Sequence, residues 1–186
     1  MIRLKLILRY IFVNSINNTD SLNHLIIGGS RGIGRALVEQ SIQAGQKVTV
    51  LSRTAPSVDI PGCDWITGDA SAPDNFLDQL PEQINALTFC PGKVILGPIK
   101  RLKTEQMLEA YKTSVLDAFT IVQALLPRLE GSIVFLSSVA AGTGLPSHCA
   151  ISAAKSGLEG FAVALAADLA PKVRVNVIAP TLTPTE

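Results

Sequence analysis

A glycine-rich run near the start of the chain has the composition of a phosphate-binding loop. The run extends from Gly28 to Gly34 (GGSRGIG) and lies between an expected strand and an expected helix. Gly28 permits a sharp turn, Gly32 lets the backbone approach a pyrophosphate without an obstructing Cβ, and Gly34 lets the helix pack closely on the sheet. The helix N-terminus then offers unpaired N–H groups and its positive dipole end to the phosphates. The run therefore predicts a dinucleotide site, and a glycine-rich turn that binds nothing is the alternative.

The end of the next expected strand indicates which dinucleotide fits. An acidic side chain at that place accepts a hydrogen bond from the ribose 2′-hydroxyl, whereas a basic side chain pairs with a 2′-phosphate. The sequence there is Leu51-Ser52-Arg53, without a carboxylate, and Arg31 in the loop can offer the same phosphate a planar, bidentate fork. We therefore expect NADP rather than NAD. A solvated Arg53 without a ligand is the other interpretation.

Short apolar runs alternate with longer helical stretches after Asp20, which is typical of a parallel α/β sheet. The expected strands cover residues 25–27, 47–51, 65–66, 86–89, 131–136 and 174–178, and the expected helices cover 33–44, 75–80, 104–126 and 147–169. The pattern predicts one Rossmann-type, doubly wound α/β domain over residues 23–186, with helices on both faces of the sheet. Residues 1–22 are expected to form an N-terminal extension.

Composition excludes several classes of protein. Of the 186 residues, 47% are apolar and 17% are charged, which suffices for a large core and excludes a disordered chain. The net charge of +1 gives no overall positive field, so we expect no nucleic-acid partner. Cys63, Cys90 and Cys149 stand far apart, without metal-ligand spacing. We therefore expect no metal site, no disulfide framework, and a reducing compartment, the cytoplasm.

The first residues, Met1 to Val13, combine basic and apolar side chains. Lys5 and Arg9 interrupt the apolar run and no small-residue cleavage pattern follows, so a secretory signal is disfavoured. The segment is too short for a spanning helix, and we expect no stable membrane span. It is either a basic amphipathic segment that lies on the domain or on a membrane surface, or an extension outside the folded unit.

Several spaced motifs together resemble the short-chain dehydrogenase/reductase family. They are the glycine loop, with Ile27 where the family has threonine, the run Gly68-Asp69-Ala70, the pair Ser137-Ser138, Lys155, and the run from Val173 to Pro180. The resemblance covers about residues 23–186 and implies hydride transfer between NADP(H) and a small carbonyl or alcohol. It also implies that Asp69 holds the adenine ring and that the turn at Pro180 passes under the nicotinamide. The implied cofactor contacts are Gly28, Ser30, Arg31, Gly32, Ile33, Gly34, Arg53, Asp69, Ala70, Gly92, Lys155 and Pro180.

The resemblance implies catalytic roles for Ser138 and Lys155. Ser138 would hydrogen-bond the substrate carbonyl as hydride arrives. Lys155 would hold the nicotinamide ribose and lower the pKa of a tyrosine proton donor. The tyrosine position, four residues before Lys155, holds Ile151, which cannot donate a proton. Ser114 replaces the family's asparagine, where its hydroxyl can still hold a water, and Pro91 removes a backbone donor from the family's N-N-A-G run.

Two side chains next to Ile151 are candidates to replace the proton donor. His148, with an ordinary pKa of about 6.5, lies one helical turn earlier, although a histidine at a helix start is more often a cap or a surface residue. Cys149 is expected to pack as a small buried hydrophobe. Loss of a positioned general acid costs about 10²- to 10⁴-fold in rate. An oxidoreductase that uses water as its acid, a non-catalytic NADP-binding sensor or partner subunit, and a truncated product that folds poorly all stay open.

The sequence ends at Glu186, where the family continues into a substrate-covering segment and a last strand. We expect a sheet that lacks this last strand, either because the chain is a fragment or because a partner covers the sheet edge. The helices expected over 104–126 and 147–169 resemble those through which family members form dimers and tetramers. A homo-oligomer is therefore expected, although packing on the sheet uses part of both helices.

Overall fold

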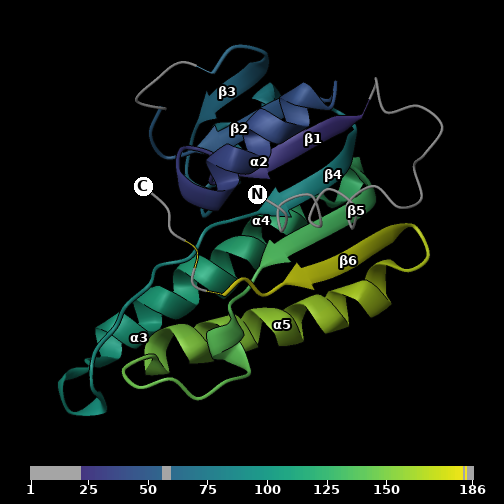
Figure 1. Cartoon of the computed structure of the whole chain (residues 1–186). Helices are drawn as coiled ribbons and strands as arrows, with labels where there is room; N and C mark the ends of the chain where they lie inside the picture. The colour runs from purple at the N-terminus through teal and green to yellow at the C-terminus, as the bar shows by residue number, and fades with distance from the viewer. Residues whose placement is uncertain (1–21, 56–59, 182, 184–186) are drawn as a thin grey trace.

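Six parallel strands form the sheet of this protein, as the computed structural model shows for residues 22–55, 60–181 and 183 (Figure 1). The strand order is β3-β2-β1-β4-β5-β6. The strands are β1 (Asn23–Ile27), β2 (Lys47–Ser52), β3 (Cys63–Thr67), β4 (Ile84–Phe89), β5 (Leu129–Leu136) and β6 (Val173–Ile178). This arrangement confirms the Rossmann-type α/β fold. The expected N-terminal extension, apart from its last residue, lies outside the described residues.

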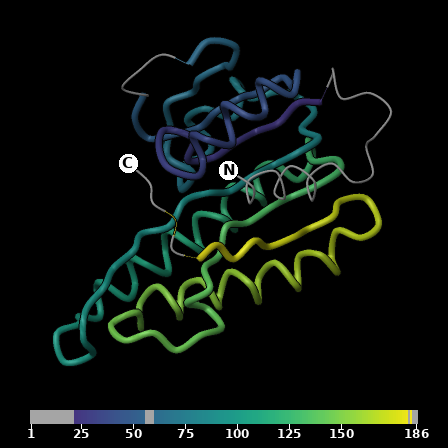
Figure 2. Tube along the Cα trace, in the orientation of Figure 1, coloured from purple at the N-terminus to yellow at the C-terminus, as the bar shows by residue number. Residues whose placement is uncertain are grey.

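Helices cover both faces of the sheet. The helix α2 (Gly32–Gln43) lies on one face, and α3 (Thr104–Tyr111), α4 (Asp117–Leu125) and α5 (Cys149–Leu169) lie on the other (Figures 1 and 2). Alternate residues of β1 supply the two cores: Ile26 packs in the cluster with Leu37 and Val38 of α2, whereas Leu25 and Ile27 pack in the larger cluster with α4 and α5. A strand buried on both faces needs apolar residues at every position, which explains the unbroken apolar run in the sequence.

Two expected helices differ from the structure. The helix expected over 104–126 is interrupted by one π turn, Lys112–Leu116, which separates α3 from α4, and a 3-10 turn, Leu126–Arg128, follows α4. The short helix expected over 75–80 is instead two 3-10 turns, Pro73–Asn75 and Leu77–Gln79. They are separated because Phe76 is completely buried in the larger core and adopts a φ of −149°.

The helix α5 has the length and composition of a membrane-crossing helix, with a mean hydropathy of 1.3. In the structure it packs along β6 and α3 (Figure 1). Its residues Leu158 and Ala162 lie in the larger core. We attribute its apolar composition to this place between the sheet and the neighbouring helix.

A buried histidine is the most polar feature of the central strand. His24 on β1 is 1% exposed, and its Nε2 lies 2.9 Å from Thr88 Oγ1 on β4. Its Nδ1 lies 3.2 Å from both Ser41 Oγ and Gln46 Oε1. Burial lowers the pKa of His24 to about 4, and the Gln46 contact opposes this shift. The folded protein therefore holds His24 neutral at physiological pH.

We expect mild acid to destabilise the fold through His24. The pKa is 6.5 for an ordinary histidine and about 4 here, so the unfolded chain binds more protons in this interval. The stability that depends on neutral His24 is fully present above pH 6.5. It is lost as the pH decreases toward 4, which lowers the free energy of unfolding by about 3 kcal/mol in total. Denaturant unfolding at several pH values between 6.5 and 4 measures the slope of the free energy of unfolding against pH.

The matched variants are His24→Gln and His148→Gln, which remove the two histidines of the chain in turn. The His24→Gln variant should lose most of the slope between pH 6.5 and 4, whereas His148→Gln should retain it. Equal slopes in the two variants would contradict the assignment.

Candidate active site

The loops after β1 and β4 meet at the point where the sheet reverses its direction of growth. The chain adds β2 and β3 on one side of β1, and then returns to place β4 on the other side. The Cys90 N–H donates to the Ile27 carbonyl over 3.0 Å. A Cβ on Gly28 would lie 3.3 Å from two ring carbons of Pro91. In open α/β sheets, ligands bind in the crevice at such a switch point.

The glycines of the first loop have the geometry that their spacing predicts. Gly28 and Gly32 have positive φ angles of 83° and 58°, which side chains rarely adopt. A Cβ on Gly34 would lie only 2.1 Å from the Gly28 carbonyl oxygen. The sharp turn and the close packing of α2 on the loop are therefore confirmed, whereas a bound phosphate stays a prediction.

The N-terminus of α2 follows this turn directly. Arg31 is the N-cap residue; its side chain is exposed and makes no capping hydrogen bond. The Arg35 N–H donates to the Arg31 carbonyl over 3.2 Å, so the N–H groups of the first turn have no acceptor within the helix. The Ile33 side chain packs against the smaller core. Ser30 and Ile33 are both half-buried.

A second group of predicted contacts lies beyond the ends of β2 and β3. Asp69 is exposed, and its Oδ1 accepts from the Ser71 N–H over 2.9 Å and from the Ser71 hydroxyl over 2.8 Å. The Ser71 N–H is the main cause that lowers the pKa of Asp69, and the charges of Lys112 and Arg53 lower it further. Arg53 is exposed and acts electrostatically on Asp69, so these two predicted contacts share one corner. The Ala70 side chain packs in the larger core, which leaves only its backbone for a ligand.

Lys155 is a buried cation between the ends of β4 and β5. Its side chain is 5% exposed, and its Nζ donates to the Leu136 carbonyl over 2.6 Å and to the Pro91 carbonyl over 3.2 Å. Within the described residues it forms no ion pair. Burial lowers the pKa of Lys155 to about 8. Burial also raises the pKa of the Cys90 thiol to about 12, although the charge of Lys155 opposes this rise.

Ser114 contributes an unpaired hydroxyl beside Lys155. It lies in the π turn, is completely buried, and its Oγ has no hydrogen-bond partner among the described residues. A Cβ on Gly92 would lie 2.8 Å from Lys155 Nζ and 3.5 Å from Ser114 Oγ. The absent side chain of Gly92 thus leaves a small space that both polar groups border. Buried hydroxyls are normally satisfied, so Ser114 marks a place for a water or a ligand group.

Ser138 is held beside the carboxyl end of β6. It is half-buried and begins the 3-10 turn Val139–Ala141, where its Oγ accepts from the Ala140 N–H over 3.2 Å. The Val139 N–H donates to the Pro180 carbonyl over 3.2 Å, which places the predicted contact Pro180 next to Ser138.

Side-chain hydrogen bonds that the sequence did not reveal fix α5 to this region. Ser137 Oγ donates to Glu159 Oε1 over 2.5 Å, and Ser156 Oγ donates to the Ala141 carbonyl over 2.9 Å. Together with the bond from Lys155 to Leu136, they connect three positions of α5 to the end of β5 and to the 3-10 turn that follows it. Serine and glutamate on a helix are too common to reveal such contacts in a single sequence.

The residues considered as proton donors lie at the start of α5. Ile151 is 3% exposed and fills the predicted tyrosine position with a buried apolar side chain. His148 is the N-cap residue but does not cap the helix; its Nδ1 donates to the Pro146 carbonyl over 2.7 Å. The expectation that Cys149 is buried is wrong, because the first residue of α5 points to solvent while Ala150 and Ile151 face inward.

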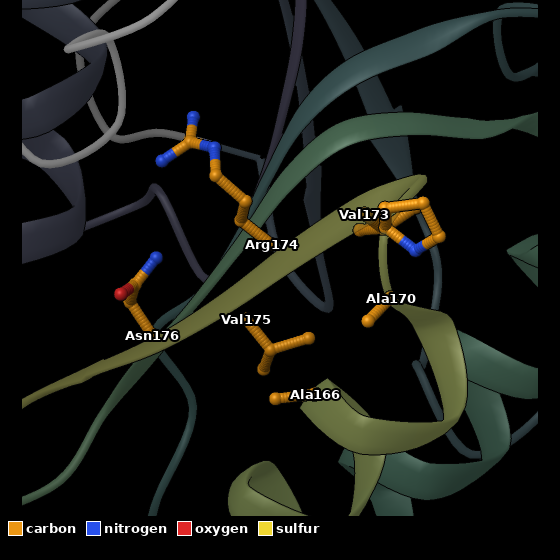
Figure 3. A pocket seen from close by; sticks show the side chains of 7 residues that line it. Ala166, Ala170, Val173, Arg174, Val175 and Asn176 are labelled. Atoms are coloured by element: carbon orange, nitrogen blue, oxygen red, sulfur yellow. The ribbon is translucent and has the colours of Figure 1, made fainter.

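A shallow hollow of about 330 Å³ lies away from these residues. It runs along β6 and the end of α5, where Arg174 and Asn176 extend from one side of the strand and Val175 faces Ala166 (Figure 3). It contains none of the predicted site residues. The crevice at the strand ends is therefore the stronger candidate for the chemistry.

Comparison with known proteins agrees with this geometry. The family model described as short chain dehydrogenase matches residues 68–186, which is more than half of the chain. This chain belongs to the short-chain dehydrogenase/reductase family. Members of the family are oxidoreductases that use NAD(P).

Similar proteins include reductases from animals. A human 3-oxoacyl-[acyl-carrier-protein] reductase is 32% identical over 173 residues, which cover 83% of this chain and 73% of the relative. Carbonyl reductase family member 4 of Danio rerio is 31% identical, with 87% and 76% covered. A solved short chain dehydrogenase family protein from Francisella tularensis superposes with a TM-score of 0.82 at 26% identity, over 89% of this chain and 72% of that chain.

The Gly34→Ala variant should be strongly destabilised, because its Cβ would collide with the Gly28 carbonyl oxygen at 2.1 Å. We expect a loss of about 1–3 kcal/mol or more in the free energy of unfolding, together with weaker dinucleotide binding. The matched control is Gly160→Ala in α5, where a Cβ meets no atom within 4 Å. That change should stabilise the helix by about 1 kcal/mol. Urea unfolding measures both, and wild-type stability of Gly34→Ala would contradict the packing argument.

Proposed function

We propose that this protein is an NADP-dependent oxidoreductase that transfers hydride between NADP(H) and a small carbonyl or alcohol. The observation that carries the proposal is the buried Lys155, whose Nζ lies next to the unpaired Ser114 hydroxyl at the switch point of the sheet. Burial of a charged group without an opposite charge costs stability. A structural protein has no physical need for this cation, whereas a dinucleotide site does.

The residues present fit the proposed cofactor. The N–H groups at the start of α2 would hold the pyrophosphate, and Gly28 and Gly34 create the close approach that this requires. Arg53 and Arg31 are exposed and would pair with a 2′-phosphate, while Asp69 in the same corner would bind the adenine. Lys155 would donate to the nicotinamide ribose.

Side chains around the substrate carbonyl would carry out the other steps of the reaction. The cofactor, when bound, supplies the hydride. The Ser138 hydroxyl would donate a hydrogen bond to the substrate oxygen, where negative charge develops. Ile151 cannot supply the proton, so we assign this role to a water held by Ser114 Oγ and Lys155 Nζ. A pKa of about 8 allows Lys155 to exchange a proton near neutral pH.

Ile151 favours a second function, in which the protein binds NADP without catalysis as a sensor or as the partner subunit of an active relative. A buried isoleucine at this position removes the positioned acid but leaves the cofactor loop intact. Both functions require a folded chain, so a cooperative thermal transition separates them from a product that folds poorly.

Titration with NADPH and NADH, followed by cofactor fluorescence, tests the proposed cofactor. We expect NADPH to bind more tightly. Arg53→Ala should weaken NADPH binding by about 10- to 100-fold and leave NADH binding nearly unchanged, because one charge-assisted contact contributes about 1.5–3 kcal/mol. The control is Arg35→Ala, which removes a cation that pairs with Glu39 on α2. Equal binding of both dinucleotides by the wild type would contradict the assignment.

The Ile151→Tyr variant tests whether the missing proton donor limits turnover. If the rest of the site is competent, reduction of simple ketones in the presence of NADPH should accelerate by about 10²-fold or more. Absorbance of NADPH measures the rate. Because Ile151 is buried, thermal melting and NADPH affinity must show that the variant is folded. A folded, NADPH-binding variant without any gain would support the sensor or partner-subunit function.

We also propose that two copies associate through α4 and α5. Both helices bury residues against the sheet, yet Phe119 of α4 and Val163 of α5 are 47% and 74% exposed. Leu116 and Leu126, in the turns that flank α4, are 49% and 43% exposed. Such an apolar surface is typical of an interface.

We also propose that the protein works in a reducing compartment, the cytoplasm. The thiols of Cys90 and Cys149 form no disulfide, which supports this proposal.

A further inference from the structure

The segment between β4 and α3 combines exposed apolar and basic side chains. We call residues 93–103 the basic apolar loop. Its side chains Val94, Leu96 and Ile99 are 68%, 55% and 70% exposed. Large apolar side chains scattered singly are ordinary on protein surfaces, whereas three within six residues form a patch that needs an explanation.

The loop is held in place from beneath, so the exposed side chains are fixed outward. Ile95 is buried with Ala110 and Ala154, and Leu102 packs against the same cluster. The Gly97 N–H donates to the Ser147 carbonyl over 2.9 Å, which ties the loop to the segment before α5. Ile95 and Leu102 thus supply the apolar contacts that pack the loop on the protein. The exposed side chains are not needed for this packing.

Basic residues surround this patch. Lys93, Lys100, Arg101 and Lys103 are exposed, and residues 91–104 include no aspartate or glutamate. Lys93 pairs with Glu109. Within the described residues, the other three cations form no ion pair. The whole chain has a net charge of only +1, so this concentration of positive charge is local.

We propose that the basic apolar loop docks the protein on an anionic lipid bilayer. Apolar side chains can enter the boundary between headgroups and acyl chains, while lysine and arginine bind the phosphates above it. The loop turns back at a projecting end of the molecule, beyond α3 (Figures 1 and 2). A projecting apolar tip rimmed by cations suits a deformable bilayer better than a rigid protein partner. This proposal does not depend on the proposed hydride transfer.

Cosedimentation of the full chain with phosphatidylcholine vesicles, with and without phosphatidylserine, tests the proposal. We expect binding to the anionic vesicles that decreases with salt. The double variant Lys100→Gln/Arg101→Gln should bind about 25-fold more weakly, at about fivefold for each cation. The triple variant Val94→Ser/Leu96→Ser/Ile99→Ser should lose about tenfold or more.

Two controls separate the loop from other surfaces. Lys47→Gln/Lys172→Gln removes two exposed cations at the amino ends of β2 and β6, whereas the loop follows the carboxyl end of β4, and this variant should bind vesicles as the wild type does. Arg3→Gln/Lys5→Gln/Arg9→Gln removes the cations of the N-terminal segment and should retain the dependence on the loop. Thermal melting confirms that each variant is folded.

Absence of wild-type binding to anionic vesicles would overturn the proposal. So would loop variants that bind as the wild type, or loss of all binding in the N-terminal variant alone. A change in self-association of the loop variants without vesicle binding would assign the patch to a second copy and equally overturn bilayer docking.

Discussion

Lys155 brings a charged group into a place where the surrounding strands and helix exclude water. Its Nζ is satisfied by two backbone carbonyls, those of Leu136 and Pro91, and by no carboxylate among the described residues. Burial therefore lowers its pKa to about 8. The two bonds connect α5 to the end of β5 and to the segment that follows β4. Ile151, one turn before Lys155 on the same helix, is also buried.

The bond from Lys155 to the Pro91 carbonyl also explains the sequence at Pro91 and Gly92, which follows β4. From the sequence, Pro91 removes a backbone donor from a site where the family has N-N-A-G. In the structure the relevant group of Pro91 is its carbonyl, which accepts from Lys155, while its ring packs 3.3 Å from the Cβ position of Gly28. The loss of one N–H is therefore compatible with the local arrangement. A Cβ on Gly92 would lie 2.8 Å from Lys155 Nζ, so a side chain there would displace the ammonium group from its present position.

Local rules decide the structure of the glycine loop and of the buried strands. The turn at Gly28 needs a positive φ, Gly34 needs close packing, and unbroken apolar runs need a strand buried on both faces, so the loop and the strands could be predicted. Features that tertiary contacts decide could not be predicted. The exposure of Cys149 depends on the side of α5 that faces the sheet. The sequence indicated that the Ser114 hydroxyl can hold a water, but it did not reveal the π turn or the burial of this hydroxyl without a partner among the described residues.

Ile151 lies at the position where the family resemblance implies a tyrosine, and under the proposed function this limits what Lys155 can do. In the family pattern, the lysine both holds the nicotinamide ribose and makes the tyrosine more acidic. With an isoleucine in that position, only the first role and any proton exchange through Ser114 are left for it. A buried cation costs free energy of folding whether or not it catalyses. Because the buried cation lies beside the glycine loop, dinucleotide binding is the common requirement of both proposed functions. They differ in whether the site also delivers a proton to a substrate.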